Sequence, residues 1–179
     1  LHDVFKIKGV FFFDDALNIS KRRLIEICDE IIKRNLHEKM EFACQMRANS
    51  QLVSPDLFKK MREANFRRVE FGFESGSEKV LKSIRKDLTI KEIKEAVRMA
   101  GEAGIRVKGF FMVGNWGENI WDILKTWRLV LSIDVEPSFA ICTPFPGTDF
   151  YRMAKEKGYL DNINWRDYNQ FIPVASTDK

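Results

Sequence analysis

Several side chains suited to binding chemistry lie in short turns that each follow a strand-like apolar segment. Asp14 and Asp15 follow the first segment, Arg47 follows the second, and Glu74 with Ser75 ends the third. Adjacent carboxylates accept hydrogen bonds from an ammonium group or bind a metal ion. An arginine fork suits a carboxylate or phosphate, and a carboxylate such as Glu74 suits two ribose hydroxyls. Because parallel strands end at one rim, we expect a ligand site spread over these turns.

Each of these turns also has a purely structural interpretation. Asp15 or Asn18 can cap the following turn, and Arg47 taken alone is more typical of a surface arginine. A serine after Glu74 can cap the next helix. Capping leaves Glu74 itself unexplained, because a buried acid at a strand end is costly without a partner.

Two later turns offer shape rather than charge. Residues 113–115 begin a glycine-flanked turn, where glycine lets a flat ring or a backbone approach closely. Trp116 can stack on such a ring, although packing against a neighbouring loop is the commoner role of a turn tryptophan. Residues 143–148 hold two prolines and a glycine, which predicts a rigid loop that either shapes the turn or walls a pocket.

Alternating strands and helices must position these turns. The capping residue Ser20, the pair Ser54-Pro55 and a capping box at Thr89–Glu92 predict helix starts. Two of the expected helices begin at Ser20 and Pro55. The other four are expected at residues 77–84, 89–103, 118–132 and 148–157. The expected strands cover residues 5–13, 41–45, 68–73, 106–113 and 135–142. The first strand is apolar throughout, which predicts burial on both faces.

Strand–helix alternation without a linker predicts one α/β domain with a parallel sheet. Five such units form either an open sheet or part of a βα barrel. A complete eightfold barrel needs about 250 residues, and this chain has 179, so a barrel would be partial. Residues 159–179 are expected to form a packed but irregular extension.

Composition narrows the function classes. Apolar residues make up 45% and the net charge is only +4, which indicates a globular domain with solvated helix faces rather than a nucleic-acid surface. No apolar stretch is long enough to span a bilayer. Cys28, Cys44 and Cys142 match no metal-binding spacing, which favours reduced thiols and a cytoplasmic location. Since the chain begins with Leu1, we expect the natural amino terminus to lie upstream.

Together the turns resemble the radical S-adenosylmethionine (radical SAM) superfamily, and most closely its branch with an upstream cobalamin-binding domain, which includes magnesium-protoporphyrin ester cyclase-like proteins. Each motif alone is weak to moderate, but their order and spacing are specific over residues 10–158. The residues that carry the resemblance are 11–15, Arg47, 72–77, Val80, Leu81, Ile84, Lys86, Thr89, 103–105, Gly109, 111–114, Gly117, Glu118 and 143–148.

The resemblance implies strands 2–6 of a partial (βα)6 barrel within residues 1–158. It implies S-adenosylmethionine (SAM), a [4Fe–4S] cluster and, in this branch, cobalamin held by an upstream domain. The family's CxxxCxxC cluster loop is missing, so the loop and the first strand are expected before Leu1. Position by position, Asp14 and Asp15 would meet the SAM amino group, Arg47 its carboxylate, and Glu74 with Ser75 the ribose.

The resemblance also implies an adenine-packing region. It would comprise Val113, Gly114, Asn115, Thr143 and Pro144. Trp116 departs from the family pattern, because a proline is common before Gly117-Glu118, and this leaves the local turn shape open. No catalytic residue follows from the resemblance, and no metal ligand is assigned within this chain.

The resemblance implies a parent enzyme that cleaves SAM to a 5′-deoxyadenosyl radical for methyl transfer, cyclisation or related chemistry. Its partners would be a small-molecule substrate and an electron donor such as flavodoxin or ferredoxin, while the composition gives no reason to expect a nucleic-acid or membrane partner. The chain alone is expected to be inactive for lack of CxxxCxxC, and its exposed barrel edge invites self-association. The alternative is a non-catalytic α/β scaffold or interaction domain derived from such a barrel.

Overall fold

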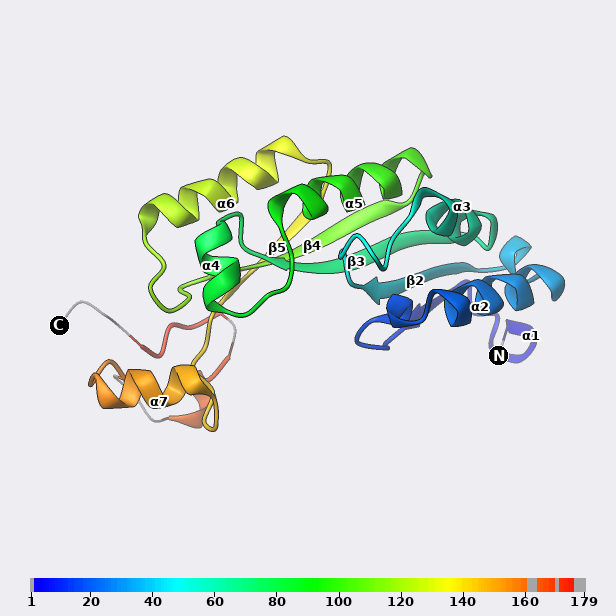
Figure 1. Ribbon diagram of the computed structural model, residues 1–179. Coiled ribbons are helices and arrows are strands. Elements are labelled where there is room, and N and C mark those ends of the chain that lie inside the picture. Colours follow the sequence, from blue (N-terminus) through cyan, green and yellow to red (C-terminus); the bar gives the residue numbers. More distant parts are fainter. Residues whose placement is uncertain (1, 161–163, 170, 176–179) are drawn as a thin grey trace.

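The computed structural model, which describes residues 2–160, 164–169 and 171–175, contains one five-stranded sheet. All neighbouring strands pair in parallel, and their spatial order β1-β2-β3-β4-β5 follows the chain (Figure 1). The strands are β1 (Gly9–Phe12), β2 (Glu41–Met46), β3 (Phe66–Glu74), β4 (Arg106–Val113) and β5 (Glu136–Ile141). The predicted parallel α/β sheet is therefore confirmed.

Helices connect the strands, and their starts follow local capping chemistry. The α-helices are α1 (His2–Phe5), α2 (Lys21–Lys33), α3 (Pro55–Glu63), α4 (Glu78–Ser83), α5 (Ile90–Glu102), α6 (Ile120–Ser132) and α7 (Asp149–Glu156). Short 3₁₀ helices are η1 (Leu17–Ile19), η2 (Leu36–Glu38) and η3 (Trp165–Asp167). Ser20 and Ser54 accept hydrogen bonds as N-caps, and Thr89 with Glu92 forms the predicted capping box. None of the described helices is both long and apolar enough to cross a membrane.

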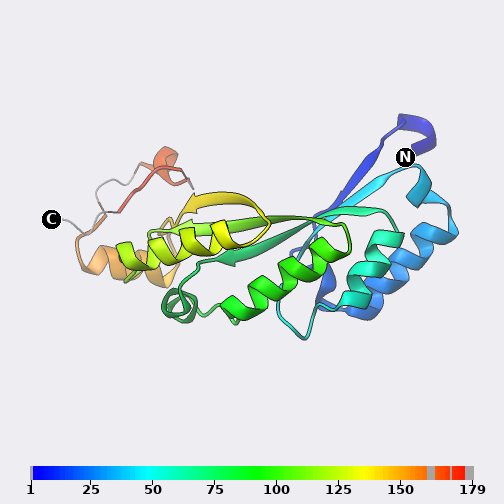
Figure 2. The same ribbon diagram turned by 90° about the horizontal axis from the view of Figure 1, so that it is seen from above.

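The main helices cover one face of the sheet. Figure 1 shows α5 and α6 along one side of β3, β4 and β5, Figure 2 shows the helices from above, and one hydrophobic core joins α2, α3, α5 and α6 to the strands. Leu24, Phe58, Ile93 and Leu129 represent these four helices in that core. Sequential strand order with helices on one face is the winding of a βα barrel, whereas doubly wound sheets carry helices on both faces. The partial-barrel expectation is thus confirmed over the open-sheet alternative.

Alternation along β3 separates the core from the open face. Phe71 and Phe73 are fully buried against the helices, and their rings stack with centroids 5.5 Å apart. Glu70, Gly72 and Glu74 alternate with them and line a cavity on the other side. The polar residues of this strand therefore face the interior of the partial barrel.

The first predicted strand is too long. His2–Phe5 forms the helix α1, Lys6 adopts a left-handed φ of 53°, and only Gly9–Phe12 pairs with β2. Its side chains are exposed or partly exposed, so the predicted burial on both faces is wrong. The physical reason is that β1 is an edge strand: β2 flanks one side only, and the helices cover one face.

The segment after α7 has little regular structure in its described part. It contains η3 and one antiparallel bridge between Leu160 and Ala175. Residues 161–163, 170 and 176–179 of the expected extension lie outside the described residues. The domain boundary at residue 158 stays a prediction, although Gly158 does close α7 with a φ of 70°.

Candidate functional site

The carboxyl ends of β1, β2 and β3 converge on one cavity of about 470 Å³. Asp15, Arg47 and Glu74, each predicted from a different turn, all line it. Lys86 and Phe110 add a cation and an aromatic ring to its wall. The cavity therefore combines acids, cations and an apolar surface at the rim where α/β proteins hold ligands.

Glu74 is held in an unusual conformation at the mouth of this cavity. Its backbone is left-handed, with a φ of 66°, and a register shift between Gly72 and Glu74 interrupts the pairing of β3 with β4. Its carboxylate accepts a hydrogen bond from the Lys86 ammonium at 3.0 Å. Non-glycine residues with positive φ are costly and concentrate at functional sites, which supports a binding role for this turn.

Gly72 makes room for the Glu74–Lys86 pair. A Cβ atom at Gly72 would lie 2.6 Å from Glu74 Oε1 and 3.2 Å from Lys86 Nζ. Only glycine lets the carboxylate fold back over the strand. The partner Lys86 was not assigned to the site from sequence, although it belonged to the motif pattern, because it lies 12 residues away.

Arg47 is exposed, and its backbone is fixed by a buried amide. The Asn18 side chain accepts a hydrogen bond from Arg47 N–H (2.9 Å) and donates to the carbonyls of Arg47 (2.8 Å) and Leu52 (3.1 Å). Asn18 is fully buried. It therefore joins the turn after β1 to the turn after β2, rather than capping its own turn.

The two acids after β1 have different surroundings. Asp14 forms an ion pair with Arg23 at 3.2 Å, and both side chains are more than one-third exposed. Asp15 is exposed and lines the cavity. The structure therefore places Asp15, but not Asp14, beside Arg47 and Glu74.

Loops from distant parts of the chain close the wall around Arg47. Asn49 donates a side-chain hydrogen bond to the carbonyl of Asp87, and Ser50 N–H donates to Glu92 Oε1 at 2.9 Å. The Ser50 contact lowers the pKa of Glu92 below its usual value. These contacts join the loop after β2 to the start of α5.

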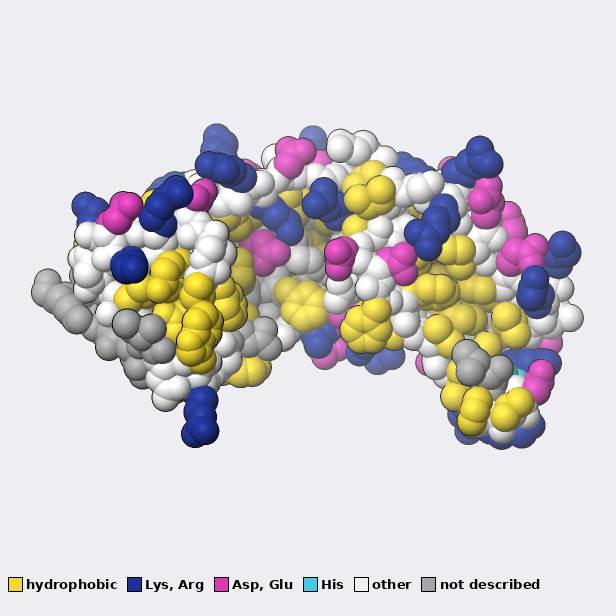
Figure 3. Space-filling view, turned by 90° about the horizontal axis from the view of Figure 1, so that it is seen from below, with side chains coloured by type: hydrophobic (Ala, Val, Ile, Leu, Met, Phe, Trp, Pro, Cys, Tyr) yellow, Lys and Arg dark blue, Asp and Glu magenta, His cyan; other side chains and the backbone are white. Residues whose placement is uncertain are grey.

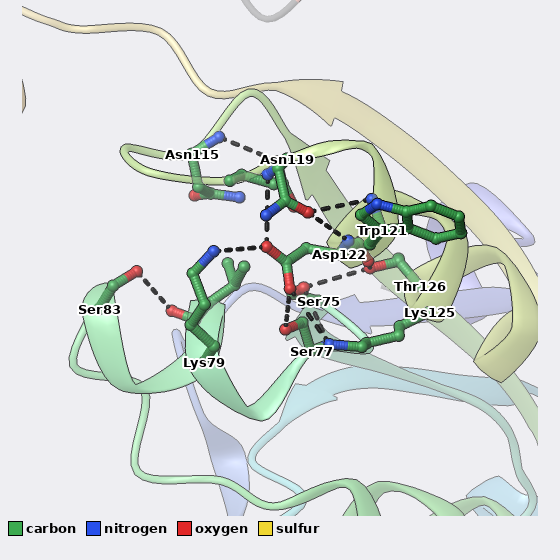
Figure 4. A network of polar contacts seen from close by, with 12 residues as sticks. Ser75, Ser77, Lys79, Ser83, Asn115, Asn119, Trp121, Asp122, Lys125 and Thr126 are labelled. Atoms are coloured by element: carbon green, nitrogen blue, oxygen red, sulfur yellow. Dashed lines mark hydrogen bonds and ion pairs between the residues drawn. The ribbon is translucent and has the colours of Figure 1, made fainter.

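Ser75 lies in a buried polar network at the junction of α4 and α6 (Figure 4). Its hydroxyl is 3.1 Å from Thr126 Oγ1, which also accepts the Gly76 N–H at 2.9 Å. A Cβ at Gly76 would lie 2.6 Å from Lys125 O and from Thr126 Cα. The turn after Glu74 thus packs directly on the α6 backbone, and Ser75 does not line the cavity.

Asp122 is the charged centre of this network (Figure 4). It is 2% exposed, accepts the Ser77 hydroxyl at 2.7 Å and pairs with Lys79 at 2.7 Å. The Lys79 and Ser77 hydrogen bonds hold the pKa of Asp122 well below the usual range of an aspartate. Sequence reasoning did not identify Asp122; its signal was the capping spacing with Asn119, which the structure shows as a capping box.

The turn after β4 is folded around Glu118. Its Oε2 accepts hydrogen bonds from the backbone N–H groups of Gly114 (2.6 Å) and Asn115 (3.0 Å). Burial raises the pKa of Glu118 above the usual glutamate value. Glu118 Oε1 and Asn115 Oδ1 are buried and have no hydrogen-bond partner among the described residues. This turn could therefore accept two further hydrogen bonds.

The remaining predicted residues lie beside this turn and outside the cavity lining. Val113 O accepts the Cys142 N–H at 2.8 Å, which joins the ends of β4 and β5. Thr143 Oγ1 donates to Asn169 O at 2.8 Å, and Pro144 is buried. Trp116 packs against Phe150 and Tyr159 with ring centroids about 6 Å away, which confirms the packed interpretation of this tryptophan.

The cysteines are poorly placed for metal chemistry. Cys28 and Cys44 are fully buried in the core, where burial raises the pKa of Cys28 to about 12 and raises that of Cys44 further. Burial raises the pKa of Cys142 to about 11. Across the described part of the chain, no group of three or more His, Cys, Asp or Glu side chains could hold a metal ion.

Comparison with known proteins agrees with this geometry. Residues 4–130 match the model of the radical SAM superfamily. An uncharacterized methyltransferase of Pyrococcus horikoshii is 30% identical over 97% of this chain and 37% of its own length. The anaerobic magnesium-protoporphyrin IX monomethyl ester cyclase of Cereibacter sphaeroides is 28% identical over 93% of this chain and 28% of its own length.

Solved structures share the fold. The radical SAM methyltransferase TsrM of Kitasatospora setae, with cobalamin and a [4Fe–4S] cluster bound, superposes with a TM-score of 0.73 at 15% identity, over 89% of this chain and 30% of its own. The cobalamin-dependent radical SAM enzyme OxsB gives a TM-score of 0.64 at 20% identity, over 97% and 25%. The chain spans about a third of the length of the relatives it matches. Its sequence and its singly wound parallel sheet show that the chain belongs to the radical SAM superfamily.

Proposed function

We propose that this chain forms the SAM-binding wall of a radical SAM enzyme, with SAM in the cavity at the ends of β1, β2 and β3. The observation that carries this proposal is the convergence of Asp15, Arg47 and Glu74 on one cavity of about 470 Å³. That volume lies within the range of about 300–1,000 Å³ for small-molecule sites. Three strands far apart in sequence thus present complementary charges to one space.

The donor set matches the chemistry of SAM. An ammonium fits the Asp15 carboxylate, and a carboxylate fits the Arg47 guanidinium. Glu74 accepts hydrogen bonds from ribose hydroxyls while Lys86 neutralises its charge. Outside the cavity lining, in the turn after β4, Glu118 Oε1 and Asn115 Oδ1 have no hydrogen-bond partner among the described residues, and they are acceptors suited to the amino group of an adenine that reaches this turn. These residues bind and orient.

Bound SAM, together with a reduced [4Fe–4S] cluster, supplies a 5′-deoxyadenosyl radical for hydrogen abstraction. The chemistry that follows would be methyl transfer, cyclisation or a related reaction on a small molecule. An electron donor such as flavodoxin or ferredoxin would reduce the cluster. By likeness to TsrM and OxsB, whose structures contain cobalamin, the parent enzyme would also use cobalamin.

This chain's cysteines would not supply the cluster. Cys28 and Cys44 are inaccessible in the core, and Cys142 is only partly exposed. We therefore expect the 179-residue chain to cleave no SAM by itself. Reconstitution with iron and sulfide under anaerobic conditions tests this expectation, and a stoichiometric [4Fe–4S] absorbance on this chain would refute it.

Calorimetric titration of the chain with SAM and with 5′-deoxyadenosine tests the binding role. The wild-type chain should bind both, and Glu74→Ala should weaken both because it removes the predicted ribose acceptor. Arg47→Ala should weaken SAM but not 5′-deoxyadenosine, because the latter has no carboxylate. If neither substitution changed the affinity for SAM or 5′-deoxyadenosine, the result would favour a non-catalytic scaffold.

One observation favours the scaffold alternative strongly enough to test. Among the described residues, the edge strands β1 and β5 each pair on one side only, and Phe13 and Leu131 are 83% and 84% exposed. Unpaired edges and exposed apolar side chains promote association. Light scattering across a concentration series would show dimers or larger species if self-association is the role of these edges, and a monomer throughout would exclude it.

A further inference from the structure

The open face of the sheet has a second hollow at the amino-terminal end of the strands, opposite the rim. Its volume is about 300 Å³, and its lining includes Arg67, Arg68, Arg106 and Glu41. Figure 3, which views the molecule from below, shows a surface hollowed between two lobes, where basic and acidic side chains lie among apolar ones. We call Arg67, Arg68 and Arg106 the arginine cluster.

A bulge brings two consecutive arginines to this hollow. Phe42 pairs with Phe66 and Ala43 pairs with Arg68, so Arg67 is an extra residue on β3. In a bulge, two residues oppose one on the partner strand, and the strand bends locally. Arg67 and Arg68 therefore line the same cavity, although adjacent residues of a regular strand would point to opposite faces.

The third arginine lies directly across from the second. Arg68 and Arg106 are register partners in β3 and β4. Like charges directly opposite one another on neighbouring strands are destabilising. An anion between them would turn this repulsion into attraction.

The acids nearby do not saturate the arginine cluster. Glu70 contacts Arg68 Nη2 at 2.9 Å, and Glu41 is 3.9 Å from Arg67 Nε. The Nε atoms of Arg67 and Arg68 are buried without a hydrogen-bond partner, and no described acid forms an ion pair with Arg106. Buried donors left unpaired are costly, and the arginine cluster holds two such N–H groups beside the exposed guanidinium of Arg106.

We propose that the arginine cluster binds an anionic group, a carboxylate or a phosphate, of the enzyme's substrate. Guanidinium forks match the geometry of both groups and bind them through paired hydrogen bonds. The assignment to the substrate rests on the proposed function, whereas the anion-binding property of the cluster does not.

The layout of the open face sets the shape of such a substrate. Glu70 lines the rim cavity and contacts Arg68, so the two cavities meet at this pair. Arg68 and Glu74 are six residues apart on β3, which corresponds to roughly 20 Å at about 3.3 Å per residue. A molecule with an anionic end in the arginine cluster would thus present its other end, less than about 20 Å away, to the SAM cavity.

The test is calorimetric titration of the full 179-residue chain with inorganic phosphate and with succinate, as separate probes. The informative variant is Arg106→Gln, because Arg106 is exposed and its removal also relieves repulsion with Arg68, so the variant should fold. The matched control is Arg128→Gln, an exposed arginine on α6. We expect Arg106→Gln to weaken the bound anion about tenfold, the value of one charge-assisted pair, and Arg128→Gln to change affinity less than about twofold.

The stronger of the two probes identifies the group as phosphate or carboxylate. Equal affinities in Arg106→Gln and Arg128→Gln, or no binding of either probe to the wild-type chain, would overturn the proposal. SAM titration separates this result from the proposed function. Unchanged SAM binding by Arg106→Gln is expected, and a wild-type chain that binds phosphate but not SAM would refute the proposed function while retaining the anion site.

Discussion

Two parts of the same rim use similar residues in different ways. At the ends of β1 to β3, Asp15, Arg47 and Glu74 surround an open cavity. At the junction of α4 and α6, Ser75, Ser77 and Asp122 are buried, and Ser77 donates its hydroxyl to Asp122 and its N–H to Ser75 Oγ. The first region offers its polar groups to a ligand, while the second uses them to fix the backbone beside it.

Gly72, near the end of β3, and Gly76, in the turn that follows, show the same difference. An added Cβ would approach a side chain at Gly72, namely the Glu74 carboxylate, but backbone at Gly76. A side chain can rotate away, whereas backbone of a packed helix cannot. We therefore expect a substitution at Gly72 to lower ligand affinity and a substitution at Gly76 to lower the free energy of unfolding.

The largest effect on stability is expected from Gly76→Ala. Its Cβ would lie 2.6 Å from two backbone atoms of α6, so α6 must shift, at a cost of about 3 kcal/mol in the free energy of unfolding. Urea denaturation measures it. The control Gly101→Ala has no atom within 4 Å of its Cβ and should stabilise α5 by about 0.5–1 kcal/mol. If Gly76→Ala and Gly101→Ala changed the free energy of unfolding by similar amounts, the close packing of Gly76 on α6 would not matter for stability.

Asp122→Asn should come next, with a loss of about 2 kcal/mol at pH 7. The pKa of Asp122 is lowered in the folded state by Lys79 and Ser77. Its contribution is therefore present above the unfolded pKa of about 3.9 and lost as pH falls below it. The stability gap between the wild type and Asp122→Asn should narrow below about pH 4, and a gap that stays constant in acid would argue against this ion pair.

Gly72→Ala should act on binding instead. The added methyl displaces the Glu74 carboxylate from Lys86, so SAM affinity should fall about tenfold, while stability changes by about 1 kcal/mol or less. Calorimetry and denaturation on the same preparation separate these effects. A variant that unfolds as readily as Gly76→Ala would remove the distinction between the two glycines.

The smallest effects are expected from substitutions of the adjacent acids Asp14 and Asp15. Asp14→Asn removes an exposed ion pair with Arg23 and should change stability by less than about 0.5 kcal/mol without affecting SAM binding. Asp15→Asn should weaken SAM about fivefold while leaving stability unchanged. A larger loss of affinity in Asp14→Asn would reverse their assignment.

Local signals in the sequence were sufficient for most of the fold. Ser20, Ser54 and Thr89 cap helices as predicted, because each bonds within its own first turn. The first strand was overestimated, since apolar residues 4 and 5 fall in a short helix and β1 lies at an edge. An apolar strand is buried only where a neighbouring strand or helix covers it.

Contacts between distant residues could not be predicted in the same way. The partner of Glu74 lies 12 residues further on and the partner of Ser77 lies 45 further on, so neither pairing has a periodic signal. Glu118 was expected to begin a helix, but it folds back onto Gly114 and Asn115 while Asn119 caps α6. The residue types in the turns were therefore enough to predict where the site lies. Which of these side chains face the cavity and which support the backbone depends on tertiary packing.

Hydrogen–deuterium exchange of the chain with and without SAM shows which segments SAM contacts. If SAM binds in the cavity, exchange should slow in the loops around it, at residues 14–19, 47–52 and 85–88, and should not change in the outer turns of α6. Protection confined to α6 and the segment after β5, with the three cavity loops unchanged, would contradict this placement of SAM.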